Sequence, residues 1–130
     1  MNIKRGMMTM SFELFIDIDQ DFDRFLESKT WGFIKSNWKY IEEFKLFPEL
    51  YYRRSSSGHV HLKLEFQSEP DLMIQFQIRA LMHDDPFRIA LDLRRLPIQG
   101  KDEINRIFSS KYKNGQLNSV GEWIKLEVEK

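Results

Sequence analysis

Two segments of this chain alternate apolar and polar residues with a period of two, and this pattern constrains the fold more than any other feature. In the first segment, Phe12, Leu14, Ile16 and Ile18 alternate with Glu13, Phe15, Asp17 and Asp19. In the second, Val60, Leu62 and Leu64 alternate with His59, His61 and Lys63. Successive side chains of a strand point to opposite faces of a sheet. The pattern therefore predicts strands over 11–19 and 59–66, each with one face in a core.

Two helices are predicted between and after these strands. Trp31, Ile34, Trp38 and Ile41 recur at helical spacing, and Thr30 is placed to cap the first turn. Ser68-Glu69-Pro70-Asp71 matches a capping box, and the apolar residues after it predict a helix that runs to about Met82. Further strands are predicted over 50–54 and 86–93, and Ser55–Gly58 forms a hairpin turn between 50–54 and 59–66.

The resulting order, β-α-β-β-α-β, predicts an α+β fold of ferredoxin-like or RRM-like type. In this arrangement two helices cover one face of a sheet and leave the other face free for ligands. Asn114-Gly115 favours a turn between 104–113 and 123–128, which predicts a C-terminal β-hairpin extension. A chain of 130 residues is long enough to bury a core, so we expect one domain over 11–130 after a flexible leader over 1–10.

Composition excludes several classes of site. The 20 basic and 20 acidic side chains cancel, so a contact with nucleic acid would need a local basic patch. The absence of cysteine excludes disulfides, thiolate zinc sites and a cysteine nucleophile. No apolar run reaches the roughly 18 residues of a membrane span, and residues 1–10 lack the apolar core of a signal peptide. We therefore expect an intracellular, cytoplasmic protein without a membrane partner.

The polar faces of the predicted strands carry the candidate functional residues. Three strands present carboxylates and imidazoles on their non-apolar faces: Asp17, Asp19, His59, His61 and Asp92. Carboxylates with nearby histidines are typical of sites that hold a divalent metal and a phosphate. Asp84-Asp85-Pro86, in contrast, is interpreted as a helix start, because acidic residues suit the positive end of a helix.

Basic residues are expected around this site. By period-two alternation Lys63 shares the face of His59 and His61, and Arg88 shares the face of Asp92, so both can add positive charge around a triphosphate. Arg53 and Arg54 precede the serine turn and are candidates for contact with a nucleic-acid backbone.

Three of these segments resemble the motifs of the archaeo-eukaryotic primases, a family that includes primase-polymerases. They are a strand of three hydrophobic residues and two aspartates ending at Asp19, the serine-glycine turn and histidine strand over 55–64, and the hydrophobic-aspartate pair within 89–92. In that family the first and third motifs bind divalent metal, and the histidine of the second contacts nucleotide phosphate. The resemblance implies that Asp17, Asp19 and Asp92 are catalytic ligands of Mg²⁺ or Mn²⁺. It also implies that His61, with His59 and Ser57 as neighbouring candidates, contacts phosphate.

The resemblance implies a minimal primase palm, of the kind expected in an archaeal mobile element or virus. Its activity would be metal-dependent nucleotidyl transfer in DNA replication, because phosphoryl transfer needs charge neutralisation and alignment more than a covalent catalyst. Its substrates would be a nucleoside triphosphate and single-stranded nucleic acid, and a larger replication subunit is an expected partner.

Two other functions fit parts of the same sequence. His59-Val60-His61 also matches the His-hydrophobic-His signature of replication-initiator endonucleases, in which both histidines bind metal and a helical tyrosine attacks DNA. Tyr112 is the candidate tyrosine, although Asn114-Gly115 favours a turn there rather than a helix. The third function is non-catalytic: an RRM-like module that binds single-stranded nucleic acid without metal.

Overall fold

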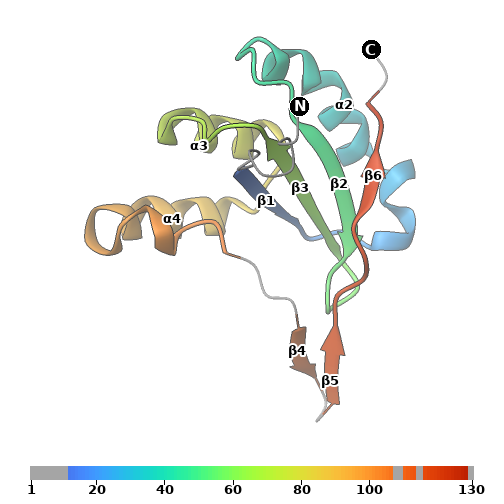
Figure 1. The fold of residues 1–130 in the computed structure, drawn as a ribbon. Helices are drawn as coiled ribbons and strands as arrows, with labels where there is room; N and C mark the ends of the chain where they lie inside the picture. Colours follow the sequence, from blue (N-terminus) through green and yellow to red (C-terminus); the bar gives the residue numbers. More distant parts are fainter. Residues whose placement is uncertain (1–11, 107–109, 114–115, 129–130) are drawn as a thin grey trace, which may run out of the picture.

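The computed structural model describes residues 12–106, 110–113 and 116–128, and the chain has an α+β fold (Figure 1). The strands are β1 (Phe12–Ile18), β2 (Glu49–Arg54), β3 (Val60–Phe66), β4 (Ser110–Lys113), β5 (Gln116–Ser119) and β6 (Ile124–Leu126). The helices are α2 (Lys29–Glu42), α3 (Leu72–Leu81) and α4 (Pro86–Gln99), with the 3-10 helices η1 (Phe22–Glu27) and η2 (Lys101–Glu103). An antiparallel sheet has the order β1-β3-β2-β6, and β4 pairs with β5 alone. The leader predicted over 1–10 lies outside the described residues.

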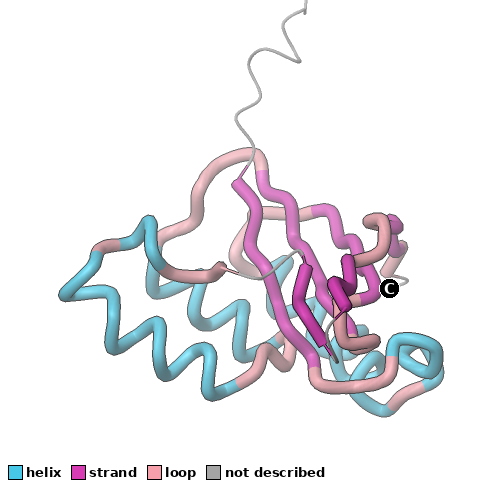
Figure 2. Tube along the Cα trace, turned by 90° about the horizontal axis from the view of Figure 1, so that it is seen from below, coloured by secondary structure: helices cyan, strands magenta, loops and turns pink. Residues whose placement is uncertain are grey.

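One face of the sheet forms the core, as the alternating pattern predicts. The buried apolar residues of the strands are Leu14, Ile16, Ile18, Leu50, Val60, Leu62, Leu64 and Phe66. Helix α2 buries the four apolar residues that predicted it, Trp31, Ile34, Trp38 and Ile41, against this face. The helices lie on one side of the sheet (Figure 2). The predicted strands over 11–19, 50–54 and 59–66 are thus confirmed within one or two residues, and their polar faces lie away from the core.

The register of the sheet aligns polar residues of three strands on the open face. Asp17 of β1 pairs with His61 of β3, which pairs in turn with Arg53 of β2. One row further along, Phe15 pairs with Lys63. Side chains directly opposite on antiparallel strands lie close together. The predicted convergence of Asp17 and His61 therefore follows directly from the pairing of β1 with β3.

Trp123, which precedes β6, lies over this open face. Its ring is 6.1 Å from the ring of Phe15 and nearly parallel to it, at 26°. The Arg53 guanidinium carbon lies 4.2 Å from the centre of the indole, and the Lys63 Nζ lies 4.9 Å from it. Cations over an indole face are attracted by the ring quadrupole. The C-terminal part of the chain therefore covers and positions side chains of the central strands.

The strand predicted over 86–93 is wrong, because this segment forms helix α4. The Asp85 side chain accepts a hydrogen bond from the Phe87 N–H (2.9 Å), and Pro86 occupies the first helical position. An acidic cap followed by proline is a strong helix start. The apolar residues after it satisfy both a period of two and a helical period, and arginine, leucine and alanine favour the helix. Asp92 therefore lies on a helix and not on a strand.

Side chains occupy the edge of β1 where a fourth ferredoxin-type strand would pair. Asn105 accepts from the Phe15 N–H (2.6 Å) and donates to the Phe15 carbonyl (2.8 Å). Asp84 Oδ1 accepts from the Asp17 N–H (2.8 Å), and the Asp85 N–H donates to the Asp17 carbonyl (3.0 Å). The unpaired N–H and C=O groups of an edge strand can pair with another chain. Here these two side chains and the Asp85 N–H form hydrogen bonds with the edge groups of β1. Strand β6 extends the opposite edge of the sheet.

Smaller features also differ from the prediction. Ser28, and not Thr30, caps α2, because its hydroxyl accepts from the Trp31 N–H (3.2 Å). Asp71 caps α3 without a side-chain hydrogen bond, so the capping box is not formed as predicted. A C-terminal hairpin is present as β4 and β5, but its second strand is Gln116–Ser119 and not the predicted 123–128, because Ile124–Leu126 forms β6 and pairs with β2. The turn at 114–115 lies outside the described residues.

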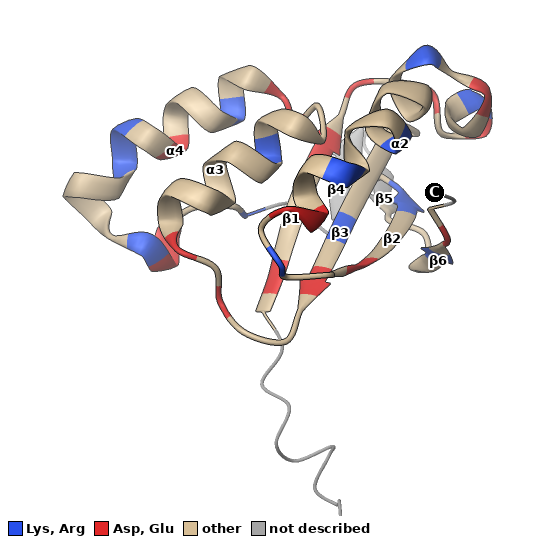
Figure 3. Cartoon of the chain, turned by 90° about the horizontal axis from the view of Figure 1, so that it is seen from above, with Lys and Arg blue, Asp and Glu red and all other residues tan. Residues whose placement is uncertain are grey.

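Charged residues of both signs are distributed along the helices and strands (Figure 3). Within the described ranges, no helix has the length and apolar character needed to cross a membrane.

Candidate functional site

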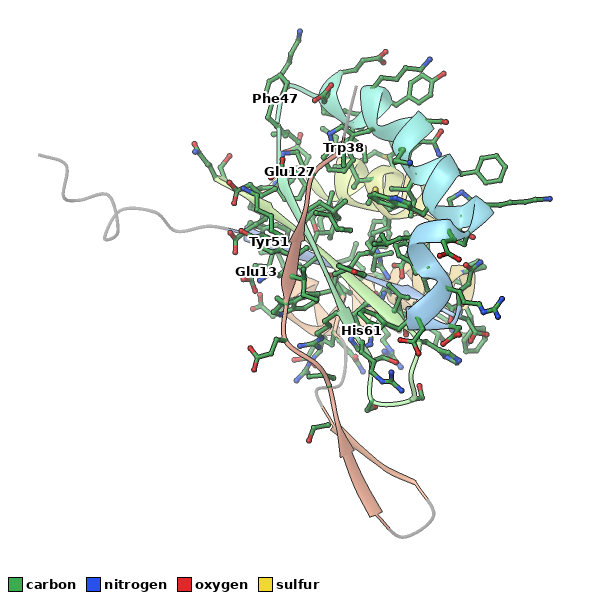
Figure 4. The ribbon with its side chains drawn as sticks, turned by 90° about the vertical axis from the view of Figure 1, so that its right-hand side faces the viewer. Glu13, Trp38, Phe47, Tyr51, His61 and Glu127 are labelled. Atoms are coloured by element: carbon green, nitrogen blue, oxygen red, sulfur yellow. The ribbon has the colours of Figure 1, made fainter. Side chains whose placement is uncertain are left out.

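A pocket of about 350 Å³ lies where β1 ends and β3 begins, and we call it the histidine pocket. It is lined by Asp17, Asp19, Ser55, Ser56, Ser57, His59, His61, Asp85, Arg88 and Arg106. Figure 4 shows His61 towards the end of the sheet from which the β4–β5 hairpin extends, whereas Trp38 and Phe47 lie at the opposite end. The sequence predicted six of these residues as site residues: Asp17, Asp19, Ser57, His59, His61 and Arg88.

The serine turn between β2 and β3 forms one wall of the pocket. The buried Ser55 hydroxyl accepts hydrogen bonds from the N–H groups of His59 (2.9 Å) and Ser57 (3.3 Å). Gly58 has a φ of +86°, a conformation that glycine adopts at little cost. Serine hydroxyls stabilise turns by such bonds to the local backbone. The turn therefore holds His59 and Ser57 at the pocket with a fixed backbone.

His61 is buried and held by Arg53. The Arg53 Nε–H donates to His61 Nδ1 at 3.1 Å, and His61 Nε2 lies 4.0 Å from Asp17 Oδ1. Burial, aided by the charges of Arg53 and Arg88, lowers the pKa of His61 to about 4. A neutral imidazole that accepts at Nδ1 carries its proton on Nε2. His61 therefore presents a hydrogen-bond donor on the side of Asp17 and the pocket.

Because His61 is buried in its neutral form, we expect the protein to lose stability in acid. Between a pKa of about 6.5 in the unfolded chain and about 4 in the folded protein, the unfolded state binds more protons. Stability therefore falls as the pH decreases through this window. We expect the urea midpoint of the wild-type protein to fall more between about pH 6.5 and pH 4.5 than that of a His61→Gln variant. Equal pH dependence of the two proteins would contradict a buried neutral His61.

Asp17 affects stability in the opposite direction. Burial raises the pKa of Asp17, and the nearby carboxylates of Asp84 and Asp85 add to the effect, whereas Arg88 opposes it. The folded state thus binds this proton more readily than the unfolded state, and acidification stabilises it through Asp17. Because both proteins of the comparison keep Asp17, this contribution does not obscure that of His61.

The second predicted carboxylate is more open to solvent. The Asp19 side chain is 88% exposed, and its Oδ1 lies 3.1 Å from His59 Nδ1. Each histidine of the pocket therefore has its own aspartate neighbour, His59 with Asp19 and His61 with Asp17.

A buried ion network fixes the wall formed by the α3–α4 connection. Asp84 accepts from Arg79 Nε and from Arg88 Nη1, both at 2.6 Å, in addition to the Asp17 N–H. The side chains of Asp84 and Arg79 are 0% and 1% exposed. Arg88 lines the pocket as predicted, but it does so from the first turn of α4. Asp84 thus ties the end of β1 to the start of α4.

Asp92 does not join the other predicted carboxylates. It is buried, its Oδ2 accepts from the Asn105 N–H (2.9 Å), and Arg79 Nη1 lies 2.8 Å from the same oxygen. The Arg79 contact is an ion pair without hydrogen-bond geometry, and Arg79 Nη2 has no hydrogen-bond partner among the described residues. Asp92 is absent from the lining of the histidine pocket. Its assignment as a metal ligand depended on a strand that is a helix, and we withdraw it.

Asp85 and Arg106 line the pocket, and sequence reasoning missed both. Asp85 was interpreted as a helix start, which is correct, but the same residue also adds a carboxylate beside Asp17. Its helix-cap pattern gave no signal of this second role. Arg106 is 70% exposed and reaches the pocket from the segment before the hairpin, far from any recognised motif.

Three predicted basic residues do not line the pocket. Lys63 is buried and lies 3.6 Å from Glu13, 3.8 Å from Glu65 and 4.8 Å from the Tyr51 ring centre. Arg53 is buried between Trp123 and His61. Arg54 is half-exposed and lies 3.9 Å from Asp23. Lys63 and Arg53 therefore support the site from within the sheet face, and Arg54 alone retains an exposed guanidinium.

The carboxylates of the histidine pocket suit a divalent ion that brings further ligands with it. No group of three histidine, aspartate or glutamate side chains in the described part of the chain is arranged as a ready metal centre. Mg²⁺, however, is typically held by one or two carboxylates together with substrate phosphates and water. Asp17 and Asp19 line one pocket and supply two such carboxylates. The donor set therefore suits an ion that arrives with a phosphate ligand.

The geometry gives little support to the alternative of a replication-initiator endonuclease. The backbone around Tyr112 forms strand β4 and not a helix, as the Asn114-Gly115 signal indicated. The Tyr112 side chain lies outside the described part of the structure. His61 Nδ1 accepts from Arg53, which leaves one nitrogen for a metal.

Comparison with known proteins gave no neighbours. A scan against protein-family models, a search of curated proteins and a search of solved structures each found no match to this chain.

Proposed function

We propose that the histidine pocket binds the phosphates of a nucleoside triphosphate and that the protein is a minimal nucleotidyltransferase related to the primase palm. One observation carries this proposal: two imidazoles, two guanidinium groups and three serines line one cavity together with three carboxylates. Donors of hydrogen bonds suit phosphate oxygens, and carboxylates suit the cation that accompanies them.

The phosphate-binding side of the pocket would use His59, His61, Arg88 and Arg106. A neutral His61 with its proton on Nε2 can donate to a phosphate oxygen without any change of protonation. Arg88 is oriented by Asp84 and is therefore available with little loss of side-chain entropy. The serine turn adds hydroxyls at the rim.

Asp17 and Asp19 would hold Mg²⁺ or Mn²⁺ together with substrate phosphate oxygens. When bound, the ion would neutralise charge on the triphosphate and on the leaving pyrophosphate. The protein would align the two reactants, because positioning and electrostatics supply most of the catalysis in phosphoryl transfer.

The proposed reaction joins an acceptor hydroxyl to the nucleotide. The hydroxyl oxygen forms a bond to the α-phosphorus, the bond from that phosphorus to the bridging oxygen breaks, and pyrophosphate leaves. The hydroxyl proton passes to solvent, which leaves the Asp17 carboxylate free to act as a ligand of the ion.

The arrangement of the first five major elements supports the relation to a ferredoxin-type palm. Strand, helix, two strands and helix follow in that order, and β3 lies between β1 and β2. Helix α4 would then take the place of the last strand of the ferredoxin-like fold. Single-stranded nucleic acid and a larger replication subunit would be the partners of the protein.

Binding of a triphosphate tests the proposal. We expect ATP or dATP with Mg²⁺ to bind more tightly than the unphosphorylated nucleoside, as measured by calorimetry. His59→Gln and Arg106→Gln, two replacements at partly exposed positions, should each weaken triphosphate binding about tenfold through loss of a charged hydrogen bond. Arg94→Gln, on the exposed surface of α4, is the matched control and should leave binding unchanged.

Product analysis separates the alternatives. Extension of a labelled primer in the presence of Mn²⁺ and triphosphates is expected for the wild-type protein. A covalent protein–DNA adduct that disappears in a Tyr112→Phe variant would instead support the endonuclease. Binding of single strands that survives both chelation of metal and Asp17→Asn, without any extension, would support the non-catalytic module.

A further inference from the structure

A second cavity shares its carboxylate wall with the histidine pocket. Asp17, Asp19 and Asp85 line both cavities. The second has a volume of about 320 Å³, and Gln20, Thr30, His83 and Pro86 are among its other lining residues. We call it the His83 cavity. Its size falls in the range of small-molecule sites.

The chemistry of the His83 cavity differs from that of the histidine pocket. Among the residues that the structure describes, no lysine or arginine lines it, whereas Arg88 and Arg106 line the histidine pocket. Three carboxylates without a cation repel phosphate. The amide of Gln20, which donates to the Thr30 hydroxyl (2.5 Å), adds neutral polar groups at one side. A ligand of this cavity should therefore be uncharged or cationic at the part that enters it.

An exposed aromatic pair lies beside the cavity. The His83 ring stacks on the Phe33 ring with 5.7 Å between centres and 17° between planes. Phe33 is 56% exposed although it is a large apolar residue. His83 has a φ of +63°, a left-handed conformation that few residues other than glycine adopt. The turn after α3 thus holds an imidazole against α2 with one flat surface available to a planar group.

We infer that the His83 cavity binds a nucleoside, whose base stacks beside His83 and Phe33 and whose sugar hydroxyls face Asp17 and Asp19. Sugar hydroxyls donate to carboxylates, and every base has a face that stacks on aromatic rings. The inference rests on the proposed function, because it identifies this nucleoside as the 3′-terminal residue of the acceptor strand. In-line transfer places the attacking and leaving oxygens on opposite sides of the phosphorus. Two cavities that share three carboxylates suit such a pair of substrates.

A trinucleotide with 2-aminopurine at its 3′ end tests the inference, since stacking changes the fluorescence of this base. We expect binding to the wild-type protein to quench it, and Phe33→Leu or His83→Asn to weaken the apparent affinity about 5- to 150-fold. Asparagine is chosen at position 83 because it tolerates a positive φ. Phe47→Leu is the matched control, since Phe47 is 63% exposed, and it should have no effect.

The same measurements distinguish failure of the inference from failure of the proposed function. Phe33→Leu and His83→Asn should leave triphosphate affinity within twofold of wild type, and His59→Gln should leave quenching unchanged. Unaltered quenching in both cavity variants, with normal triphosphate binding, overturns the inference alone. Direct displacement of the trinucleotide by triphosphate means a single site and also overturns it. Absence of triphosphate binding overturns the proposed function, whereas quenching that still depends on Phe33 and His83 supports the nucleoside site.

Discussion

Replacement of Asp84 by alanine is expected to lower the free energy of unfolding by about 3–5 kcal/mol, the cost of breaking a buried ion pair by removing one partner. The Asp84 carboxylate accepts from Arg79, from Arg88 and from the backbone of Asp17, and it is fully buried. Without it, Asp92 is the one anionic partner of Arg79 that remains among the described residues. Small domains have total stabilities of about 5–15 kcal/mol. Urea denaturation followed by circular dichroism measures the loss, and a large part of the population should be unfolded at modest urea concentrations.

Two further variants make the prediction specific. Asp84→Asn keeps an acceptor but removes the charge, so its effect should be smaller than that of alanine and still clearly measurable. Asp102→Ala, which removes an exposed carboxylate on η2, should change stability by less than about 0.5 kcal/mol. A loss below about 1 kcal/mol for Asp84→Ala would mean that the buried network does not hold β1 to α4.

Asp17→Asn should abolish metal-dependent binding while it preserves or raises stability. Burial raises the pKa of Asp17, so its ionised form is unfavourable in the folded protein, and a neutral amide removes that cost. Loss of a carboxylate ligand should weaken the response to Mn²⁺ with triphosphate by at least about 100-fold and reduce primer extension at least as much. Paramagnetic broadening of the His61 ring signals in Mn²⁺ titrations measures the binding independently of turnover.

Asp21→Asn, an exposed aspartate in the loop after β1, is the matched control and should retain both the Mn²⁺ response and the stability of the wild-type protein. If Asp17→Asn retained normal broadening at His61, the ion would not be held at this carboxylate. If it unfolded the protein, Asp17 would have a structural role that its raised pKa argues against.

The sheet and half of the site could be predicted from the sequence because period-two alternation is a strong local signal. It identified the buried faces of β1 and β3, and it placed Asp17 and His61 on the opposite face, where cross-strand pairing brings them together. The serine turn could also be predicted, since serine and glycine both favour turns. Ser57 and His59 accordingly line the pocket where the pattern placed them.

The role of Asp92 could not be predicted because its segment satisfies two periods at once. Residues 86–93 alternate as a strand does, yet they also follow a strong helix start, and the choice depends on tertiary contacts. The decisive contacts come from Arg79 and Asn105, which bury the Asp92 carboxylate. Asp85 was missed for a different reason, because the helix start that it forms gives no signal of a carboxylate beside Asp17.

The position of Trp123 constrains any ligand that would lie flat across the strands. Its indole already occupies the space above Phe15 and forms the aromatic neighbour of the Arg53 and Lys63 cations. A base laid over the middle of the sheet would have to displace this indole. Arg53 and Lys63 would then each lose a ring contact, and the arginine that donates to His61 would be released. A ligand on that surface would therefore disturb the hydrogen bond that holds His61, whereas a ligand at the strand ends would leave this bond in place.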